Sequence, residues 1–231
     1  MKGKLYLVPT VLSEDSLHVI PAYVHDIIKN LRVFFVENEK TARRYLRKTG
    51  YTASFDETIV LPVNEHTNKQ NFSEYVTHLL QGVDCGLMSD AGVPAVADPG
   101  AELVKLCHDK NITVIPLTGP SSILLALMAS GLNGQQFFFH GYIPVKQPDR
   151  RLYLLKMEAN AQQGITQMFI ETPYRNNTLL ADILQTCSPA TKLCIASDIT
   201  GKKEWIQTKS VADWKKNIPV LEKIPAVFLI G

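Results

Sequence analysis

The sequence predicts an α/β protein of two α/β lobes. The first lobe has a mostly parallel five-stranded sheet with helices on both faces, the second has a smaller mixed sheet, and a ligand cleft is expected between them. Two observations predict this fold class. Through residues 1–117, short apolar runs alternate with single segments of helical periodicity, and strands joined through helices pair in parallel. Through residues 118–231, the last three apolar runs lie closer together, which favours some antiparallel pairing.

The first lobe, residues 1–117, is predicted to contain five strands and their connecting helices. Apolar side chains recur every three or four residues from Leu17 to Leu31, the spacing of a helix packed on a sheet. We expect Asn71 to cap a helix over 72–81 that ends before Gly82. The predicted strands are Lys4–Pro9, Arg32–Glu37, Ile59–Val63, Val83–Met88 and Thr113–Leu117, with further helices at Lys40–Lys48 and Glu102–Lys110.

The second lobe, residues 118–231, begins with a strongly apolar helix, Ser121–Ala129. The run of three phenylalanines from Phe137 to Phe139 is expected to lie in a core strand buried on both faces, which is a more common arrangement than a platform for stacking bases. The predicted strands are Phe137–His140, Thr166–Glu171, Leu193–Asp198, Trp205–Thr208 and Ala226–Ile230, with helices near Asp149–Ala161 and Asn176–Thr186.

Composition indicates an ordinary globular protein in a reducing compartment. The 231 residues are 45% hydrophobic and 20% charged, and no apolar run is long enough for a membrane span. The first apolar run is too short for a secretory signal and is predicted to be a strand. The four cysteines lack metal-ligand or CxxC spacing, so buried free thiols, no metal site and a cytoplasmic location are expected.

A net charge of +2 and a pI near 8.3 neither require nor exclude a nucleic-acid partner. A phosphate-binding protein usually gathers its basic residues on one face. For each basic cluster in this chain, a solvated helix face or loop is the more common explanation. The clusters are Arg43, Arg44, Arg47 and Lys48; Lys146, Arg150 and Arg151; Lys202 and Lys203; and Lys215 and Lys216.

Residues 89–100, SDAGVPAVADPG, form a conformationally constrained segment directly after a predicted parallel strand. Ligands of open α/β sheets bind beyond the carboxyl ends of the strands. Asp98 followed by Pro99 is typical of a helix start, which favours a structural role for Asp98. Asp90 has no evident capping role, and ligand binding is as good an explanation for it as structure. The segment contains neither GxGxxG nor GxxxxGK[ST], so it is not predicted to cradle a phosphate.

A second constrained segment follows the fifth predicted strand. Gly119 and Pro120 interrupt the chain, and Ser121 or Ser122 can cap the next helix. Capping accounts for one serine and leaves the other available to a ligand.

Four motifs in this order and spacing resemble the tetrapyrrole methylase superfamily, whose members are S-adenosylmethionine-dependent methyltransferases of two α/β lobes. The motifs are DAGVPAVADPG at 90–100, PLTGPSS…ASGL at 116–132, FFFHGYIPVK at 137–146 and ETPYR at 171–175. Within the superfamily, the sequence is most similar to the ribosomal RNA small-subunit methyltransferase I group, which methylates a cytidine 2′-hydroxyl. The resemblance covers nearly the whole chain.

The resemblance implies an S-adenosyl-L-methionine site with the cofactor in a cleft between the lobes. The positions that match the superfamily's cofactor contacts come from both lobes. They are Asp90, Ala91, Gly92 and Val93; Ser121 and Ser122; Glu171 and Thr172; and Pro225 and Ala226.

The sequence departs from the group's pattern at positions expected to face the substrate. The loop TPIGN of the group is Thr10-Val11-Leu12-Ser13-Glu14 in this chain, and AEDTR is Val36-Glu37-Asn38-Glu39-Lys40. The sequence also stops at Gly231, where the group's enzymes usually continue. These departures affect the expected substrate more than the expected reaction.

Three residues are candidates for catalysis. Glu37, at the end of a predicted strand, is the first candidate to orient the substrate or take its proton, and a salt bridge to Arg43 or Arg44 is an equally good explanation. Glu171 ends an apolar strand and is expected to face the same cleft. Arg175 binds either a substrate phosphate or Glu171, and the ion pair is the more common of the two arrangements.

Three functions remain open at this point. The first is an S-adenosylmethionine-dependent methyltransferase that acts on RNA of the small ribosomal subunit. The second is a methyltransferase for a small molecule of the tetrapyrrole type, and the third is a non-catalytic paralogue that keeps the cofactor pocket. Family members commonly form homodimers, so a homodimer is the expected assembly.

Overall fold

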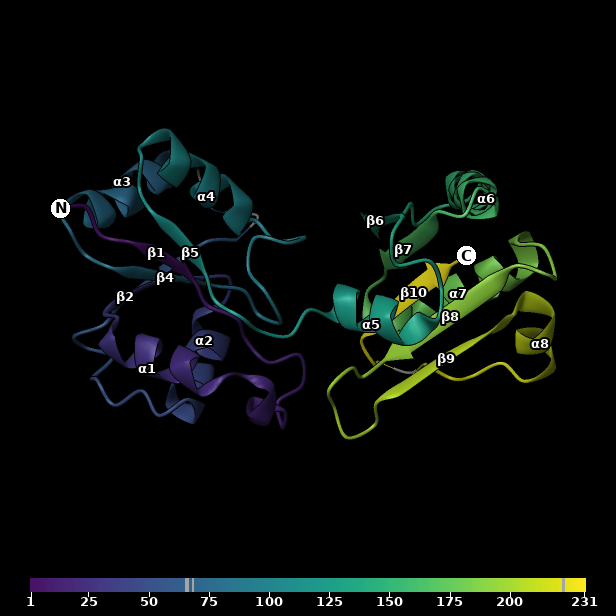
Figure 1. The fold of residues 1–231 in the computed structure, drawn as a ribbon, viewed down its shortest axis with the longest axis horizontal. Helices are drawn as coiled ribbons and strands as arrows, with labels where there is room; N and C mark the ends of the chain where they lie inside the picture. The colour runs from purple at the N-terminus through teal and green to yellow at the C-terminus, as the bar shows by residue number, and fades with distance from the viewer. Residues whose placement is uncertain (65–66, 68, 222) are drawn as a thin grey trace. The chain divides into compact units, whose positions relative to one another are not determined.

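In a computed structural model the chain folds into two compact units, Met1–Ser121 and Ser122–Gly231 (Figure 1). The structure describes residues 1–64, 67, 69–221 and 223–231, and the side chains of residues 69 and 70 are not described. We call the two parts the first unit and the second unit, and each is described by itself.

The first unit is built on a five-stranded sheet with the order β3-β2-β4-β1-β5 (Figure 1). All neighbouring strands pair in parallel, which confirms the predicted parallel sheet. The strands are β1 Leu5–Leu7, β2 Val33–Val36, β3 Ile59–Pro62, β4 Cys85–Met88 and β5 Val114–Pro116.

Helices cover both faces of this sheet, as predicted. Alternate residues of β2 point to opposite faces: Phe35 packs in one apolar cluster with α3 and α4, and Phe34 packs in another with α1 and α2. The helices are α1 Ala22–Asn30, α2 Glu39–Lys48, α3 Lys69–Leu80 and α4 Gly100–Asp109, and a 3₁₀ turn at Leu17–Val19 precedes α1.

Two predicted helix starts are wrong. Helical spacing extends back to Leu17, but Pro21 separates the 3₁₀ turn from α1, because proline suits the position just before a helix and not its interior. Asn71 lies inside α3 and does not cap it, because α3 begins at Lys69, and lysine and glutamine are good helix formers.

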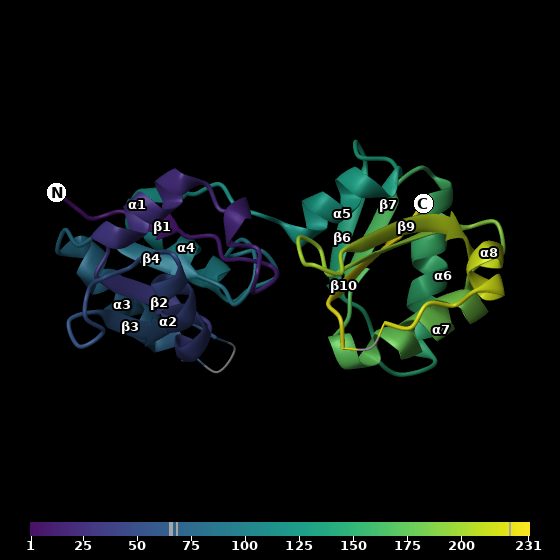
Figure 2. The same ribbon diagram turned by 90° about the horizontal axis from the view of Figure 1, so that it is seen from below.

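The second unit also has a five-stranded sheet, with the order β6-β7-β10-β8-β9, and this sheet is mixed (Figure 2). β6 and β7 pair in parallel, and the other neighbours are antiparallel, which confirms that this sheet is mixed. The expectation that it is smaller than the first sheet is wrong, because both sheets have five strands. The strands are β6 Phe137–Tyr142, β7 Thr166–Ile170, β8 Lys192–Ser197, β9 Trp205–Ser210 and β10 Ala226–Ile230.

The core of the second unit lies between the sheet and helices α6, α7 and α8 (Figure 2). Leu154 of α6, Ile183 of α7 and Trp214 of α8 pack in one apolar cluster with Phe169 and Phe228 of the sheet. The helices of this unit are α5 Ser122–Ser130, α6 Asp149–Gln162, α7 Asn176–Thr186 and α8 Val211–Lys216, and a 3₁₀ turn at Pro173–Arg175 leads into α7. In the described part of the chain, no helix is both long enough and apolar enough to span a membrane.

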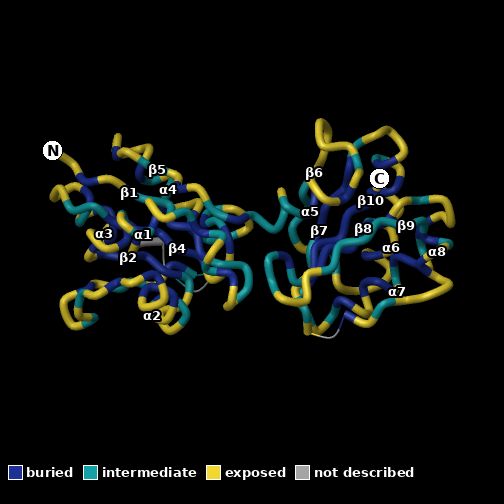
Figure 3. The backbone as a smooth tube through the Cα atoms, turned by 60° about the horizontal axis from the view of Figure 1, so that its bottom comes forward, coloured by how far each residue is buried: buried dark blue, intermediate teal, exposed yellow. Residues whose placement is uncertain are grey.

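The phenylalanine run of β6 is not a buried core strand, and that prediction is wrong. Phe137 is 41% exposed and Phe138 is 57% exposed, as the yellow segment at β6 indicates (Figure 3). The reason is that β6 lies at the edge of the sheet and is paired only with β7.

All four cysteines are buried free thiols, as predicted. Cys85 and Cys107 lie in the core of the first unit, and Cys187 and Cys194 lie in the second. Burial raises the pKa of Cys85 to about 12 and that of Cys107 to about 11.

Candidate functional site

The carboxyl ends of β1, β2 and β4 lie side by side in the first unit. β4 is hydrogen-bonded to both of the other strands, with Met88 opposite Val36 and Leu87 opposite Leu7. The residues that follow these strands therefore meet at one edge of the sheet, where open α/β sheets bind their ligands.

Glu37 and Asp90 are brought together at this edge. The backbone N–H of Asp90 donates a hydrogen bond to Glu37 Oε2 at 2.9 Å. The alternative that Glu37 pairs with Arg43 or Arg44 is wrong, because Arg43 binds Glu39 and Arg44 binds Glu14. Within the described residues, no arginine or lysine forms an ion pair with Glu37 or Asp90.

The electrostatics of this edge favour a cation. Burial raises the pKa of Asp90, and the nearby carboxylates of Glu37 and Asp98 raise it further. A positively charged group placed beside Asp90 would lower this pKa again, because it stabilises the ionised carboxylate. We call Glu37 and Asp90 the anionic edge. Among the described residues, no cationic side chain pairs with either carboxylate.

The loop after β4 has positive φ angles at one glycine and at two alanines, although only glycine adopts them without a steric penalty. Gly92, Ala95 and Ala97 all have positive φ, at 81°, 66° and 56°. The carbonyl of Gly92 accepts a hydrogen bond from the N–H of Thr10 at 2.8 Å, which fixes this loop to the loop after β1. A Cβ at position 92 would lie 3.0 Å from Leu12 Cδ2, so glycine suits this position in both respects.

Asp98 has the structural role that the sequence predicts. Its Oδ1 accepts hydrogen bonds from the N–H groups of Gly100 at 2.6 Å and Ala95 at 3.3 Å. Burial raises the pKa of Asp98, and the bond from Gly100 partly offsets this rise. The carboxylate therefore fixes the loop to the start of α4, which begins at Gly100.

An open cavity of about 180 Å³ adjoins the anionic edge. Its walls come from the loop after β1, from α2 and from residues 89–91. Tyr45 closes one side, where its hydroxyl donates to the carbonyl of Pro9 at 2.8 Å and burial raises its pKa. Arg44 and Lys48 also line the cavity. The sequence places both in a basic cluster, and Arg44 is also the possible partner of Glu37 that the structure does not confirm.

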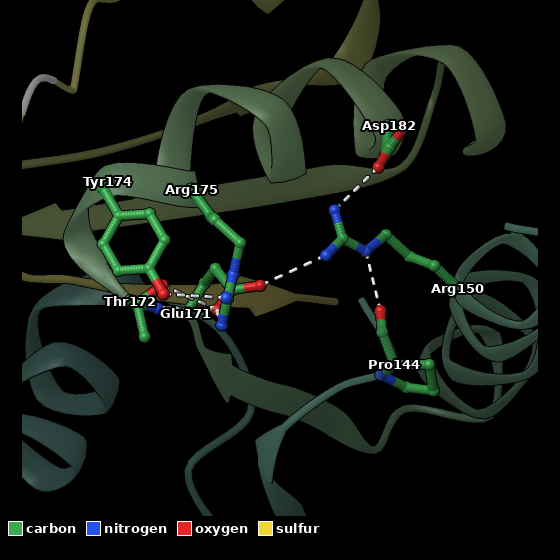
Figure 4. Close-up of polar contacts among 7 residues, drawn as sticks. All are labelled: Pro144, Arg150, Glu171, Thr172, Tyr174, Arg175 and Asp182. Atoms are coloured by element: carbon green, nitrogen blue, oxygen red, sulfur yellow. Dashed lines mark hydrogen bonds and ion pairs between the residues drawn. The ribbon is translucent and has the colours of Figure 1, made fainter. Parts of the chain in front are cut away.

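A buried ion network holds Glu171 in the second unit (Figure 4). Glu171 Oε2 lies 3.2 Å from Arg150 Nη2, and Glu171 Oε1 lies 2.7 Å from Arg175 Nη2. The N–H of Thr172 also donates to Glu171 Oε1, at 2.7 Å. Arg150 in turn binds Asp182 Oδ2 at 2.9 Å and the carbonyl of Pro144 at 2.7 Å.

The network keeps Glu171 ionised. Burial by itself would raise the pKa of Glu171, but the hydrogen bonds from Arg175 and Thr172 outweigh burial, and the pKa is lowered. The predicted alternative of an ion pair between Arg175 and Glu171 is confirmed. Both carboxylate oxygens are engaged, which suits Glu171 to positioning better than to proton transfer.

Sequence reasoning missed Asp182 in this network, and it misjudged Arg150. Arg150 was expected in a solvated cluster with Lys146 and Arg151, but Arg150 is 1% exposed, so that expectation is wrong for this residue. A signal was present in the sequence: Arg150 stands four residues before Leu154, on the apolar face of α6.

The remaining predicted cofactor residues lie at strand and helix ends. Ser121 is the last residue of the first unit, and Ser122 is the first residue of α5. In the second unit, Ala226 begins β10, and the carbonyl of Pro225 accepts from the N–H of Asp198 at 3.0 Å. Because Val227 lies opposite Ile170, Ala226 and Glu171 stand at neighbouring strand ends.

Apart from Ser121 and Ser122, between which the first unit ends and the second begins, the predicted residues form two groups, one in each unit. The first group contains Glu37, Asp90, Ala91, Gly92 and Val93. The second contains Glu171, Thr172, Arg175, Pro225 and Ala226. The cleft between the lobes stays a prediction.

Solved structures define the class to which this fold belongs. The methyltransferase CobJ is 14% identical with a TM-score of 0.66, and the match covers 99% of this chain and 94% of CobJ. Uroporphyrin-III-C-methyltransferase from Thermus thermophilus is 16% identical with a TM-score of 0.57, and the match covers 100% of this chain and 93% of that one. The fold is that of the tetrapyrrole methylases, and no family model matches the sequence.

Curated relatives define the family within this class. "Ribosomal RNA small subunit methyltransferase I" of Vibrio cholerae is 31% identical over 209 residues, which are 90% of this chain and 69% of the relative. The protein of the same name from Streptococcus pyogenes is 32% identical over 215 residues, 91% of this chain and 70% of the relative. The chain belongs to the ribosomal RNA small subunit methyltransferase I family.

Proposed function

We propose that this protein is an S-adenosylmethionine-dependent methyltransferase that methylates a ribose 2′-hydroxyl in RNA of the small ribosomal subunit. Membership of the family supports the reaction and the type of substrate. The observation that carries the proposal in the structure is the anionic edge of the first unit, where Glu37 and Asp90 meet without a cationic partner among the described residues.

The residues of the anionic edge fit the methyl donor. S-adenosylmethionine carries a sulfonium and an ammonium group, and positive charge is what the neighbouring carboxylates of Glu37 and Asp90 lack. When bound, the donor supplies an electrophilic methyl group. The proposed contacts are Asp90, Ala91, Gly92, Val93, Ser121, Ser122, Thr172, Pro225 and Ala226.

Glu37 is the proposed residue for orienting the acceptor or taking its proton. A hydroxyl group must lose a proton when it is methylated, and a nearby carboxylate can accept it. One oxygen of Glu37 binds the N–H of Asp90, which fixes the direction of the carboxylate and leaves the second oxygen for the acceptor. Exclusion of water and orientation of the two reactants are the other tasks of the chain.

Glu171 and Arg175 are proposed to act as positioning residues. Glu171 receives hydrogen bonds from Arg175 and from both the N–H and the hydroxyl of Thr172. This arrangement fixes Thr172, which is one of the proposed cofactor contacts. Neither residue has to exchange a proton for this role.

The proposal is tested by methyl transfer to isolated ribosomal subunits. Purified protein and radiolabelled S-adenosylmethionine are incubated with small subunits from a strain that lacks the corresponding methyltransferase. We expect label in the RNA, in a 2′-O-methylated nucleotide after digestion. A parallel incubation with a porphyrinogen is the control for small-molecule transfer.

The possible failures of this test are distinguishable. Label in the porphyrinogen and none in RNA would replace the proposed substrate with a tetrapyrrole. Calorimetry with S-adenosylhomocysteine is the second measurement. If no binding is seen at millimolar ligand, the enzyme proposal falls and the non-catalytic paralogue takes its place.

A cytoplasmic homodimer is the proposed working form. Four buried, unpaired thiols suit a reducing compartment. Size-exclusion chromatography with light scattering measures the molar mass of the protein in solution. A mass equal to that of one chain would reject the dimer.

A further inference from the structure

The cavity beside the anionic edge has two cations at its rim. Arg44 and Lys48 are four residues apart on α2, so they lie on the same face of the helix, and both line the cavity. Asp90 lines the cavity from the loop after β4. The cavity therefore presents positive charge from α2 and negative charge from the strand ends.

The two cations are weakly engaged by the chain itself. Arg44 Nη1 lies 2.9 Å from Glu14 Oε1, with side chains that are 51% and 69% exposed. Lys48 Nζ donates to the backbone carbonyl of Glu14 at 3.1 Å, and no carboxylate among the described residues pairs with it. An exposed ion pair of this kind contributes little to stability, so another anion can take its place.

Two other basic residues of α2 provide a contrast. The guanidinium groups of Arg43 and Arg47 lie 4.9 Å and 4.3 Å from the ring centre of Phe55. Arg43 also pairs with Glu39, and Arg47 donates to the carbonyl of Tyr51 at 2.7 Å. Four of the five basic residues of α2 thus divide into two that are held by the chain and two that face the cavity.

The size of the cavity limits what it can hold. Pockets for drug-sized ligands have volumes of roughly 300–1,000 Å³, and this cavity has about 180 Å³. A tetrapyrrole ring is too large for it. A sugar with one phosphate is compact enough, and its charge and hydroxyl groups match a rim of cations and a wall that carries Asp90 and Thr10.

We infer that this cavity binds one sugar-phosphate unit of the RNA, with the phosphate between Arg44 and Lys48. The planar guanidinium of Arg44 can bind two phosphate oxygens, and Lys48 adds a point charge. Without RNA, the carboxylate of Glu14 pairs with Arg44, and the phosphate displaces this carboxylate when RNA binds. The inference rests on the proposed function and assigns to Arg44 and Lys48 the recognition of the RNA backbone next to the anionic edge.

The test compares cations on α2 that differ in their relation to the cavity. Arg44→Gln and Lys48→Gln remove the two rim charges, and Lys40→Gln removes an exposed charge from the same helix outside the cavity. We expect each rim variant to raise the KM for undermethylated small subunits about tenfold with kcat within about twofold. We expect Lys40→Gln to match the wild type, and the affinity for S-adenosylhomocysteine to be unchanged in all three.

Binding without turnover provides the second readout. The logarithm of the affinity for small subunits falls with the logarithm of the salt concentration, and each phosphate contact contributes about 0.7–0.9 to the slope. Each rim variant is expected to lower the slope by about this amount. Glu14→Gln is expected to tighten binding, because it removes the carboxylate that competes with the phosphate.

Two outcomes would overturn the inference. One is equal weakening by Arg44→Gln, Lys48→Gln and Lys40→Gln, which indicates diffuse attraction. The other is wild-type KM and salt slope in both rim variants when thermal unfolding shows that they are folded. In either case the wild type still methylates RNA, so the proposed function stands, whereas failure of the wild type to methylate RNA counts against that function.

Discussion

The two units each place a glutamate at the end of a strand, and the two glutamates have opposite surroundings. Glu37 follows β2, is half-buried and binds only the N–H of Asp90 among the contacts described. Glu171 follows β7, is 5% exposed and has both oxygens engaged by Arg150 and Arg175. The same residue type at the same kind of position thus has a carboxylate open to a ligand in one unit and a satisfied structural anion in the other.

This difference shows that position at a strand end does not identify a catalytic carboxylate. The groups that contact a carboxylate determine whether it can bind a ligand. Two arginines hold Glu171 ionised and fixed, whereas the carboxylates of Glu37 and Asp90 repel one another until a cation arrives.

Removal of Arg150 should have the largest effect. Arg150→Ala leaves Asp182 and one oxygen of Glu171 without their partner, and breaking a buried ion pair from one side costs about 3–5 kcal/mol. Both tryptophans of the chain, Trp205 and Trp214, lie in the second unit, so urea unfolding followed by tryptophan fluorescence reports this unit.

The matched control for this variant is its neighbour. Arg151 is exposed, and Arg151→Ala should change the free energy of unfolding by no more than about 0.5 kcal/mol. Equal stability of the two variants would mean that the network contributes nothing to the second unit.

Removal of the Asp90 charge should weaken cofactor binding without destabilising the fold. Asp90→Asn keeps the size of the side chain but removes the anion proposed to face the methyl donor, so we expect affinity for S-adenosylhomocysteine to fall about tenfold or more. Calorimetry measures the change. Asp56→Asn, at an exposed aspartate elsewhere in the first unit, is the control and should bind as the wild type does. Wild-type affinity in Asp90→Asn would remove Asp90 from the site.

The pH dependence of stability should have opposite signs at the two carboxylates. The pKa of Glu171 is lowered by folding, so its stabilisation is present above its ordinary value of 4.5 and is lost as pH falls through the lowered pKa. The pKa of Asp90 is raised, so ionised Asp90 costs stability once pH rises above 3.8 and through the raised pKa.

Two variants measure these slopes between ~pH 3 and ~pH 7. At the upper end, Glu171→Gln should be less stable than the wild type and Asp90→Asn should be more stable, and both differences should shrink in acid. Tryptophan fluorescence reports the unfolding of the second unit, and far-ultraviolet circular dichroism reports the unfolding of both units. Slopes of the same sign would contradict the contrast between Glu171 and Asp90.

The smallest predicted effect is an electrostatic one. Glu37→Gln keeps an oxygen that can accept the N–H of Asp90 and removes one neighbouring negative charge. The pKa of Asp90 should therefore fall toward its ordinary value, and stability should change little. An NMR titration of the Asp90 carboxyl measures this shift, and an unchanged pKa would mean that burial and Asp98 raise it without a contribution from Glu37.

Much of the fold could be predicted because patterns over short stretches of the sequence indicate its strands and helices. The alternation of apolar runs and helical segments predicts the parallel sheet of the first unit, and the closer spacing of the last three runs predicts the antiparallel pairs of the second. Asp90 was correctly placed at a strand end. Its contact with Glu37, 53 residues away, depends on β2 lying next to β4, and this strand order is not a local property.

The rest depended on pairings across long distances in the sequence. Arg150 is a buried residue because Glu171 and Asp182 lie 21 and 32 residues further along the chain and neutralise it. Phe138 is exposed because β6 forms one edge of its sheet, and an apolar run alone does not show which strand lies at an edge.

The four buried thiols have a practical consequence. A thiol reacts as its thiolate, and burial keeps the native thiols protonated and shielded, so maleimide reagents should leave all four unmodified in the folded chain. A single cysteine placed on the surface, as in Lys40→Cys, would then be labelled selectively without mutation of any native cysteine. With a dye or spin label at such positions, the binding of the proposed ribosomal substrate can be measured in a protein that keeps all its native cysteines.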